Sequence, residues 1–155
     1  ATGENSSTTF TFNVLTAMAM SPTSLTWATV GLGDTDTGSN NDPIVINNTG
    51  NADLLTINVT GIDLRGETTA TQNISANNFT VQNASQGCSG TALINNSAQN
   101  ITTAVLQQGN NSLNLNNATS GQEEIYFCLK VLQSGLSQQP YSTLGNGAWT
   151  VAVIT

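Results

Sequence analysis

Ten Asn-X-Ser/Thr triplets are spread along the chain, and none has proline in its middle position. Such a triplet can accept an N-linked glycan, which is bulky and solvated and therefore lies on an outer surface of a secreted protein. A chain this rich in Asn, Ser and Thr also forms some triplets by chance. Because the triplets extend from near the start of the sequence almost to its last expected strand, we predict that most of them carry sugar. The acceptors are Asn5, Asn47, Asn58, Asn73, Asn78, Asn83, Asn95, Asn100, Asn110 and Asn117.

The charge balance limits the classes of partner. Arg65 and Lys130 are the only basic side chains beside nine acidic ones, His is absent, and the net charge is -7. Binding to nucleic acid requires clustered Lys and Arg, so we expect no nucleic-acid partner. The same count argues against an anionic membrane surface. No stretch has the roughly 18 to 20 apolar residues of a membrane span, so we expect none.

The start of the sequence fits a secreted product. It reads Ala1-Thr2-Gly3-Glu4, with neither an initiator Met nor a basic and apolar leader, which is the expected form of a mature chain after removal of a signal peptide. We therefore expect an extracellular protein. Its 155 residues and 37% hydrophobic content fit one domain with one core.

The two cysteines, Cys88 and Cys128, allow one intramolecular pair. In an oxidising exterior we expect a disulfide, which would stabilise the fold by roughly 3 to 4 kcal/mol in the chain-entropy model. A catalytic thiol is the alternative, but it needs a base such as His, and the sequence contains no His.

Apolar and polar residues alternate with a period of two along most of the chain, which predicts strands. No segment of ten or more residues has a 3.6-residue apolar stripe, so we expect little or no helix. The sequence predicts an all-β fold, a single β-sandwich with jelly-roll or immunoglobulin-like topology. The expected strands cover residues 8–20, 25–32, 43–47, 54–62, 78–82, 101–106, 112–115, 124–132 and 148–154.

The first expected strand is unusually long. Residues 8–20 would span roughly 40 Å at about 3.3 Å per residue, which exceeds what a small sandwich can pair along its own edge. We therefore divide the chain into an N-terminal strand segment, residues 1–20, and a sandwich domain, residues 21–155. The first half of the segment, with Phe10, Phe12 and Val14 on one face, is predicted to enter a neighbouring subunit.

Catalysis has few candidate groups. Glycosidases use two carboxylates that face each other across a sugar, whereas adjacent Glu123 and Glu124 point to opposite faces of a strand. The remaining acidic candidates lie in expected loops, and we find no Ser/His/Asp set, phosphate loop or zinc cluster. We therefore expect no catalytic residues and no enzyme. The loop acids are Asp34, Asp36, Asp42, Asp53, Asp63 and Glu67.

Two groups of residues could form binding sites, and each also has a purely structural interpretation. Asp34, Asp36 and Asp42 surround Gly38 and could hold Ca²⁺, but the spacing departs from an EF-hand, and a polar hairpin with Asx turns is favoured. We expect no other metal or cofactor. Trp27 and Trp149, with Tyr126 and Tyr141, could form a sugar platform, but the two Trp residues occupy alternating strand positions typical of a core.

Two short segments resemble immunoglobulin-like modules. In residues 123–128, Tyr126 precedes Cys128 by two positions, which resembles strand F with its tyrosine corner. However, both Trp residues lie outside the interval between the cysteines, which departs from the antibody pattern. Residues 42–51 are similar to the strand and turn of immunoglobulin-like modules in archaeal and bacterial surface proteins.

The whole chain resembles the β-sandwich subunits of archaeal extracellular filaments, which include bundling pili and glycosylated threads. The likeness lies in the signal-cleaved start, the alternating strand around Phe10, Phe12 and Val14, and the many glycan acceptors. It implies a homopolymer in which an N-terminal strand inserts into the adjacent subunit, and a role in adhesion, cell contact or biofilm formation. The alternatives are a surface-layer or adhesin module, and a carbohydrate-binding module.

Overall fold

The computed structural model describes residue 11 and residues 13–85, 87–108 and 121–155. Within these ranges the protein is all-β, and its only helical element is the short 3-10 turn η1 (Ala76–Asn78). The strands are β1 (Met18–Ser21), β2 (Thr35–Gly38), β3 (Ile44–Asn48), β4 (Leu55–Gly61), β5 (Leu64–Gly66), β6 (Asn73–Ile74), β7 (Phe79–Gln82), β8 (Thr91–Ala92), β9 (Ser97–Leu106), β10 (Gln122–Val131), β11 (Tyr141–Ser142) and β12 (Thr150–Ile154).

The largest sheet is built around β10. Its order is β1-β3-β10-β7-β8, and every pairing is antiparallel. On one side, β10 changes partner along its length: residues 122–125 pair with β3, and the pairing with β2 begins at Cys128. The sheet therefore has six strands in total.

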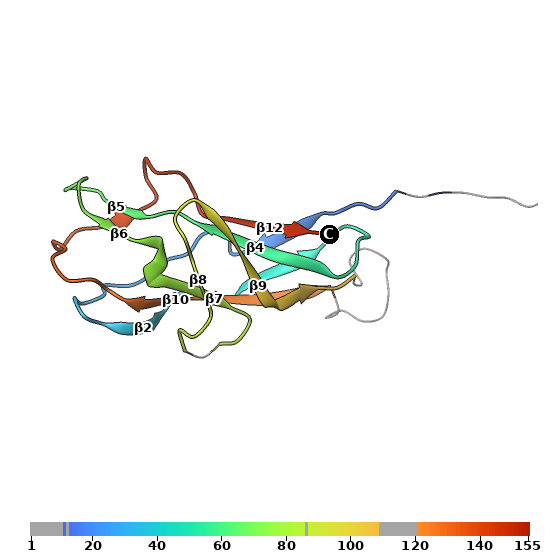
Figure 1. The fold of residues 1–155 in the computed structure, drawn as a ribbon, viewed down its shortest axis with the longest axis horizontal. Coiled ribbons are helices and arrows are strands. Elements are labelled where there is room, and N and C mark those ends of the chain that lie inside the picture. Colours follow the sequence, from blue (N-terminus) through green and yellow to red (C-terminus); the bar gives the residue numbers. More distant parts are fainter. Residues whose placement is uncertain (1–10, 12, 86, 109–120) are drawn as a thin grey trace, which may run out of the picture.

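A second antiparallel sheet, β12-β4-β9, covers the first and makes the fold sandwich-like. Figure 1 shows β4 and β12 on one side and β2, β7 and β10 on the other. A small third sheet, β11-β5-β6, extends the structure at the end of the molecule opposite the labelled C-terminus. The all-β sandwich predicted from the sequence is confirmed.

The core follows from the alternation in the strands. In β3 and β4 every second side chain is buried, as the period-two pattern requires when one sheet face is covered. Phe79 and Phe127 are the largest fully enclosed side chains, and they lie on β7 and β10 of the first sheet. Leu55, Ile57 and Val59 meet them from the second sheet.

The expected strand at residues 25–32 is wrong. This segment belongs to no strand, although Leu25 and Trp27 are still partly buried at alternating positions. Conversely, residues 35–38, which we expected in a turn, form β2 against β10. The sequence-based interpretation failed here because strand identity at a sheet edge depends on a partner, not only on alternation.

The N-terminal strand is also shorter than expected within the described residues. It begins only at Met18, and residues 13–17 precede it without regular pairing. The expected strand at residues 112–115 lies outside the described residues. The strands expected near residues 43–47, 54–62, 78–82, 101–106, 124–132 and 148–154 are confirmed as β3, β4, β7, β9, β10 and β12, with shifted ends.

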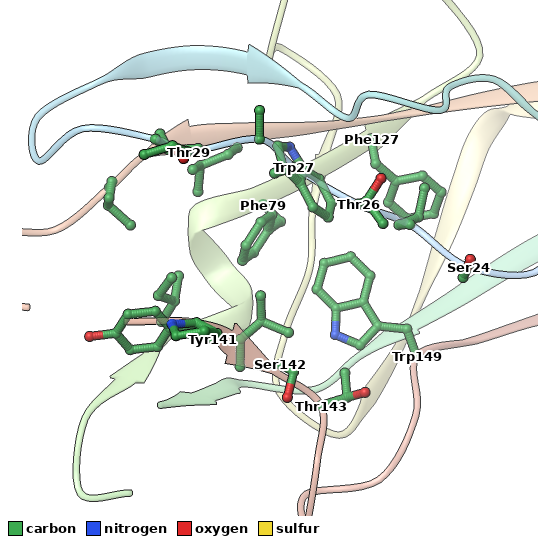
Figure 2. A pocket seen from close by; sticks show the side chains of 18 of the residues that line it. Ser24, Thr26, Trp27, Thr29, Phe79, Phe127, Tyr141, Ser142, Thr143 and Trp149 are labelled. Atoms are coloured by element: carbon green, nitrogen blue, oxygen red, sulfur yellow. The ribbon is translucent and has the colours of Figure 1, made fainter. Parts of the chain in front are cut away.

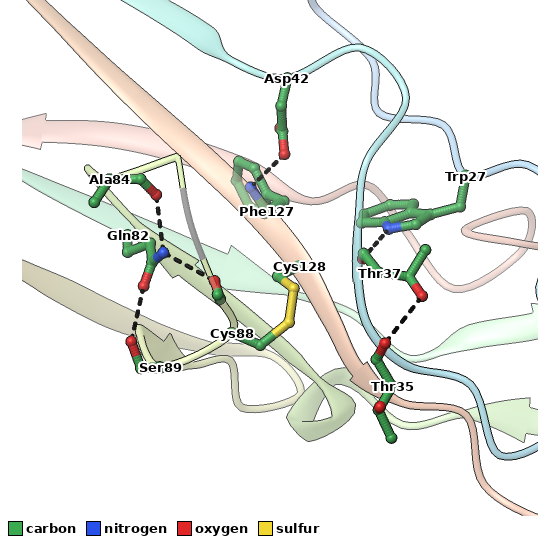
Figure 3. The surroundings of a disulfide bond; sticks show 11 residues. Trp27, Thr35, Thr37, Asp42, Gln82, Ala84, Cys88, Ser89, Phe127 and Cys128 are labelled. Carbon is green, nitrogen blue, oxygen red and sulfur yellow. Dashed lines mark hydrogen bonds between the residues drawn. A yellow bond between two sulfur atoms is a disulfide. The ribbon is translucent and has the colours of Figure 1, made fainter.

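Cys88 and Cys128 form the expected disulfide (Figure 3). Their Cα atoms are 5.4 Å apart, and the bond joins the connection after β7 to the middle of β10. Both cysteines are buried. The bond therefore ties a polar connection to a central strand of the large sheet. No helix in the described ranges is long and apolar enough to cross a membrane.

Candidate functional site: an apolar groove with unpaired rims

An apolar groove of about 1240 Å³ opens between the two layers. Its floor consists of core residues, among them Val59, Phe79 and Phe127. One rim is the segment 23–32, which has no strand partner, and the other runs from Leu136 through β11 to Trp149. Figure 2 shows the side chains of both rims converging on the same space. The groove is therefore an opening into the hydrophobic core along one side of the sandwich.

Five aromatic side chains line the groove, and four of them, Trp27, Phe79, Phe127 and Trp149, pack against one another. The centroid of Trp149 lies 5.1 Å from Phe79, 5.8 Å from Phe127 and 6.1 Å from Trp27. Both indole nitrogens are already committed to the fold: Trp27 Nε1 donates to Thr37 O at 3.1 Å, and Trp149 Nε1 donates to Ile62 O at 2.7 Å. These rings therefore supply apolar surface between the layers, and their N–H groups are not free to bind a sugar.

The rims carry backbone groups outside any ladder. Asn41, in the connection between β2 and β3 of the same subunit, holds segment 23–32 in place. Its Oδ1 accepts Thr26 N at 3.0 Å, and its Nδ2 donates to Ser24 O at 2.6 Å. The opposite rim at residues 147–149 is likewise outside any strand of the described chain. Two facing edges of this kind can each hydrogen-bond an added strand.

The N-terminal segment is anchored on the turn after β3. Leu15 O accepts Asn51 N at 2.9 Å and Ala52 N at 3.2 Å, and Asn51 Nδ2 donates to Asn13 O at 2.9 Å. Gly50 is required at this contact, because a Cβ there would lie 2.1 Å from Leu15 O. Residues 13–17 are therefore fixed within their own subunit, which limits any donated segment to the residues before them.

The predicted donor residues are only partly described. Phe10 and Phe12 lie outside the described residues. Val14 is 72% exposed and Leu15 is 58% exposed, so both leave apolar surface uncovered in the monomer. In Figure 1 this segment leaves the body close to the C-terminus. The groove reaches the other end, where Leu64 of β5 and Ile74 of β6 line it.

The glycan acceptors fall into two groups. Asn73, Asn95 and Asn100 are exposed. Among the half-buried acceptors, Asn78 Nδ2 donates to Gln133 Oε1 and Asn83 Nδ2 donates to Thr103 O. Asn47 and Asn58 are half-buried on sheet faces, and the Oδ1 atoms of both are enclosed. Asn5, Asn110 and Asn117 lie outside the described residues.

The acidic candidates have separate partners. Asp34 Oδ2 accepts Gly31 N at 2.6 Å, and Asp42 Oδ2 accepts Phe127 N at 3.0 Å. Asp36 lies beside the disulfide, with a carboxylate oxygen within 4.8 Å of both sulfurs. Among the described residues these three carboxylates therefore form no shared cluster. A disulfide has no thiolate to add as a metal ligand.

The segment that resembles strand F behaves differently from a tyrosine corner. Tyr126 donates its hydroxyl to Glu124 Oε2 at 2.7 Å on the same strand, not to an upstream backbone group. This hydrogen bond raises the pKa of Tyr126. Glu123 contacts Asn83 instead, as expected for neighbouring residues that point to opposite faces. Burial raises the pKa of Glu123, and the charge of Glu124 adds to the effect.

Comparison of the chain with protein-family models, curated proteins and solved structures found no match. The groove was missed by sequence reasoning, because its rims come from residues more than one hundred positions apart. One sequence signal was available: neither residues 6–46 nor the residues after Asn117 contain a glycan acceptor. Both rims fall in these bare stretches.

Proposed function

We propose that the protein is the structural subunit of a secreted, N-glycosylated extracellular filament. Each subunit inserts the start of its N-terminal strand, which carries Phe10 and Phe12, into the groove of the next subunit. Val14 lies at the point where the strand leaves its own subunit, beside residues that are hydrogen-bonded to the turn after β3. The filament serves adhesion, cell contact or biofilm formation. The observation that carries the proposal is the apolar groove with two unpaired rims.

The size and chemistry of the groove favour a chain segment as its occupant. Small-molecule pockets usually measure about 300 to 1,000 Å³ and contain a few placed polar groups. This groove is larger, is floored by core residues and runs between two edges. A strand with an apolar face satisfies both the edges and the floor, since its backbone pairs with the rims while alternate side chains enter the core.

The positions of donor and acceptor support an open polymer. The N-terminal segment leaves one end of the molecule, and β5 and β6, which contribute Leu64 and Ile74 to the groove, lie at the other (Figure 1). A contact between two different surfaces repeats from head to tail and need not close into a dimer. The absence of glycan acceptors from the rims also supports strand insertion, because glycans there would obstruct an incoming strand.

The experiment compares full-length protein with a variant lacking residues 1–14, viewed by electron microscopy. We expect fibres from the full-length protein and monomers or small aggregates from the variant. A peptide of residues 1–14 should bind the variant and keep it soluble, because it supplies the missing strand. Normal fibres from the variant would contradict strand donation, and two-dimensional sheets from the full-length protein would favour a surface layer.

Substitutions locate the contact. The double variant Phe10→Ala and Phe12→Ala should abolish fibres while leaving the monomer folded, since each Phe removes on the order of 150 to 250 Å² from water. Leu54→Ala is the matched control, because Leu54 is 62% exposed and does not line the groove. Phe12→Cys combined with Ala28→Cys on the groove rim should give covalent ladders with a bifunctional thiol reagent. Ladders with Leu54→Cys in place of Ala28→Cys would contradict the groove as acceptor.

A further inference from the structure

A second, polar pocket of about 480 Å³ lies beside the small third sheet. Most of its lining is polar, formed by Asp63, Arg65, Asn73, Asn95, Asn96 and Asn146. Two of these residues, Asn73 and Asn95, are also exposed glycan acceptors. We infer that this pocket binds saccharide, and that the first sugars of an N-glycan attached to Asn95 occupy it.

Hydrogen bonds hold the wall of the pocket in place. Asp63 N donates to Asn95 Oδ1 at 3.1 Å, and Asn146 Nδ2 donates to Asp63 O at 3.0 Å. Asp63 Oδ1 in turn accepts Ala76 N at 2.8 Å. These bonds join segments 62–63, 76, 95 and 146 before any ligand binds. A site fixed in advance loses less conformational entropy on binding.

The remaining polar groups suit hydroxyls. Arg65 Nε donates to Ala70 O at 3.2 Å, and no described residue accepts from its terminal N–H groups. Arg65 lies directly opposite Asn73 across β5 and β6, so both side chains share one face. Guanidinium and amide donors beside carboxylate and amide acceptors match the paired donors and acceptors of sugar hydroxyls. A polyanion is disfavoured, because Arg65 is the single cation in a pocket that also contains Asp63.

The fold fixes the orientation of the Asn95 side chain and leaves its nitrogen available. Its Oδ1 is held by Asp63 N, while no described residue accepts from its Nδ2. Transfer from a lipid-linked sugar phosphate forms a bond between Nδ2 and the anomeric carbon and breaks the anomeric carbon–oxygen bond. One Nδ2 proton is released with the lipid phosphate. The amide oxygen keeps its hydrogen bond, so the first sugar starts from a fixed position at the pocket wall.

The inference depends on the glycosylation in the proposed function but not on filament formation. The protein is purified from a glycosylating host that secretes it, and glycopeptide mass spectrometry measures occupancy of Asn95. Hydrogen exchange is then measured at the amides of Asp63 and Ala76 in two variants. Ser97→Ala removes the acceptor triplet but keeps Asn95, and Thr102→Ala removes the triplet of Asn100 as the matched control.

We expect a sugar on Asn95, and several-fold faster exchange of both amides in Ser97→Ala but not in Thr102→Ala. Arg65→Gln should speed the same exchange while the glycan mass stays attached, because only its contact is lost. Unmodified Asn95, or equal exchange in Ser97→Ala and the wild type, would overturn the inference. Faster exchange only after loss of the Asn73 glycan, through Ser75→Ala, would also overturn the assignment to Asn95. If the protein is monomeric but the glycan still slows exchange of the Asp63 and Ala76 amides, the filament proposal is wrong and the saccharide pocket stands.

Discussion

The carboxylate of Asp42 accepts the backbone N–H of Phe127 at 3.0 Å, at the point where β10 changes partner from β3 to β2 (Figure 3). On the same edge of β10, Phe127 O accepts Ser39 N at 3.0 Å. The connection between β2 and β3 thus replaces the missing ladder bonds with one side-chain and one backbone interaction. Phe127 itself is 2% exposed and contributes to the floor of the groove.

Removing this carboxylate should destabilise the protein. Asp42→Ala leaves the N–H of Phe127 without its partner, and we expect a loss of about 1 to 3 kcal/mol in the free energy of unfolding. Asp42→Asn keeps an oxygen acceptor and should lose much less. Urea unfolding of both variants measures the difference. Equal losses in the two variants would show that the hydrogen bond is not the cause.

Stability should increase as the pH falls from 7 toward about 4. Burial raises the pKa of Asp42 above its ordinary 3.8 and that of Glu123 above its ordinary 4.5. The folded state therefore binds these protons at higher pH than the unfolded state does, so acidification favours folding until the ordinary values are passed. The midpoint of urea unfolding across this range tests the sign.

A single substitution tests how much Glu123 contributes to this pH dependence of stability. Glu123→Gln keeps the oxygen that faces Asn83 but cannot ionise, so its stability should change less between pH 7 and pH 4. Glu67→Gln is the control, because Glu67 is exposed. An unchanged pH slope in Glu123→Gln would remove Glu123 as a contributor.

Reduction of the disulfide should lower stability without changing the fold. The bond closes a separation of 40 residues, which corresponds to about 3 to 4 kcal/mol in the chain-entropy model. The double variant Cys88→Ser and Cys128→Ser should lose this amount in urea unfolding. Intact mass with and without reductant should differ by two hydrogen atoms, and free thiols in native material would contradict the prediction.

Gly50→Ala should displace the N-terminal segment from the turn after β3. The added Cβ would lie 2.1 Å from Leu15 O and 2.8 Å from Ala17 N, so backbone must move. We expect a loss of about 1 to 3 kcal/mol and faster hydrogen exchange at Asn51 and Ala52. Gly38→Ala is the control, because nothing lies within 4 Å of a Cβ there. Equal effects would show that the N-terminal segment is not held at this turn.

The packing of Trp149 against three other rings should contribute strongly to stability. Trp149→Ala removes ring contacts with Trp27, Phe79 and Phe127, and we expect a loss of about 3 to 5 kcal/mol. Trp149→Phe keeps an aromatic ring but loses the donor to Ile62 O, so its loss should be smaller. Thermal or urea unfolding of both variants gives the comparison. A loss from Trp149→Ala no larger than from Trp149→Phe would contradict the packing role.

The sequence by itself determined the elements whose two faces differ in polarity. In β4 apolar side chains alternate with Thr and Asn, and burial of the apolar face fixes both the strand and its orientation. It also determined the pairing of Cys88 with Cys128, because no other thiol is present. The charge of the chain and the glycan acceptors are likewise properties that no folding can change.

Only the tertiary structure decided which edges find partners. The sequence predicts a strand at residues 25–32 and a turn at residues 35–38, yet only the second segment pairs with β10. The groove brings Trp27 beside Trp149, and the polar pocket brings Asp63 beside Asn95 and Asn146. Local alternation reports which side of a strand meets apolar surroundings. Pairing and cavities depend on contacts between residues far apart in the chain, which the order of residues along it does not encode locally.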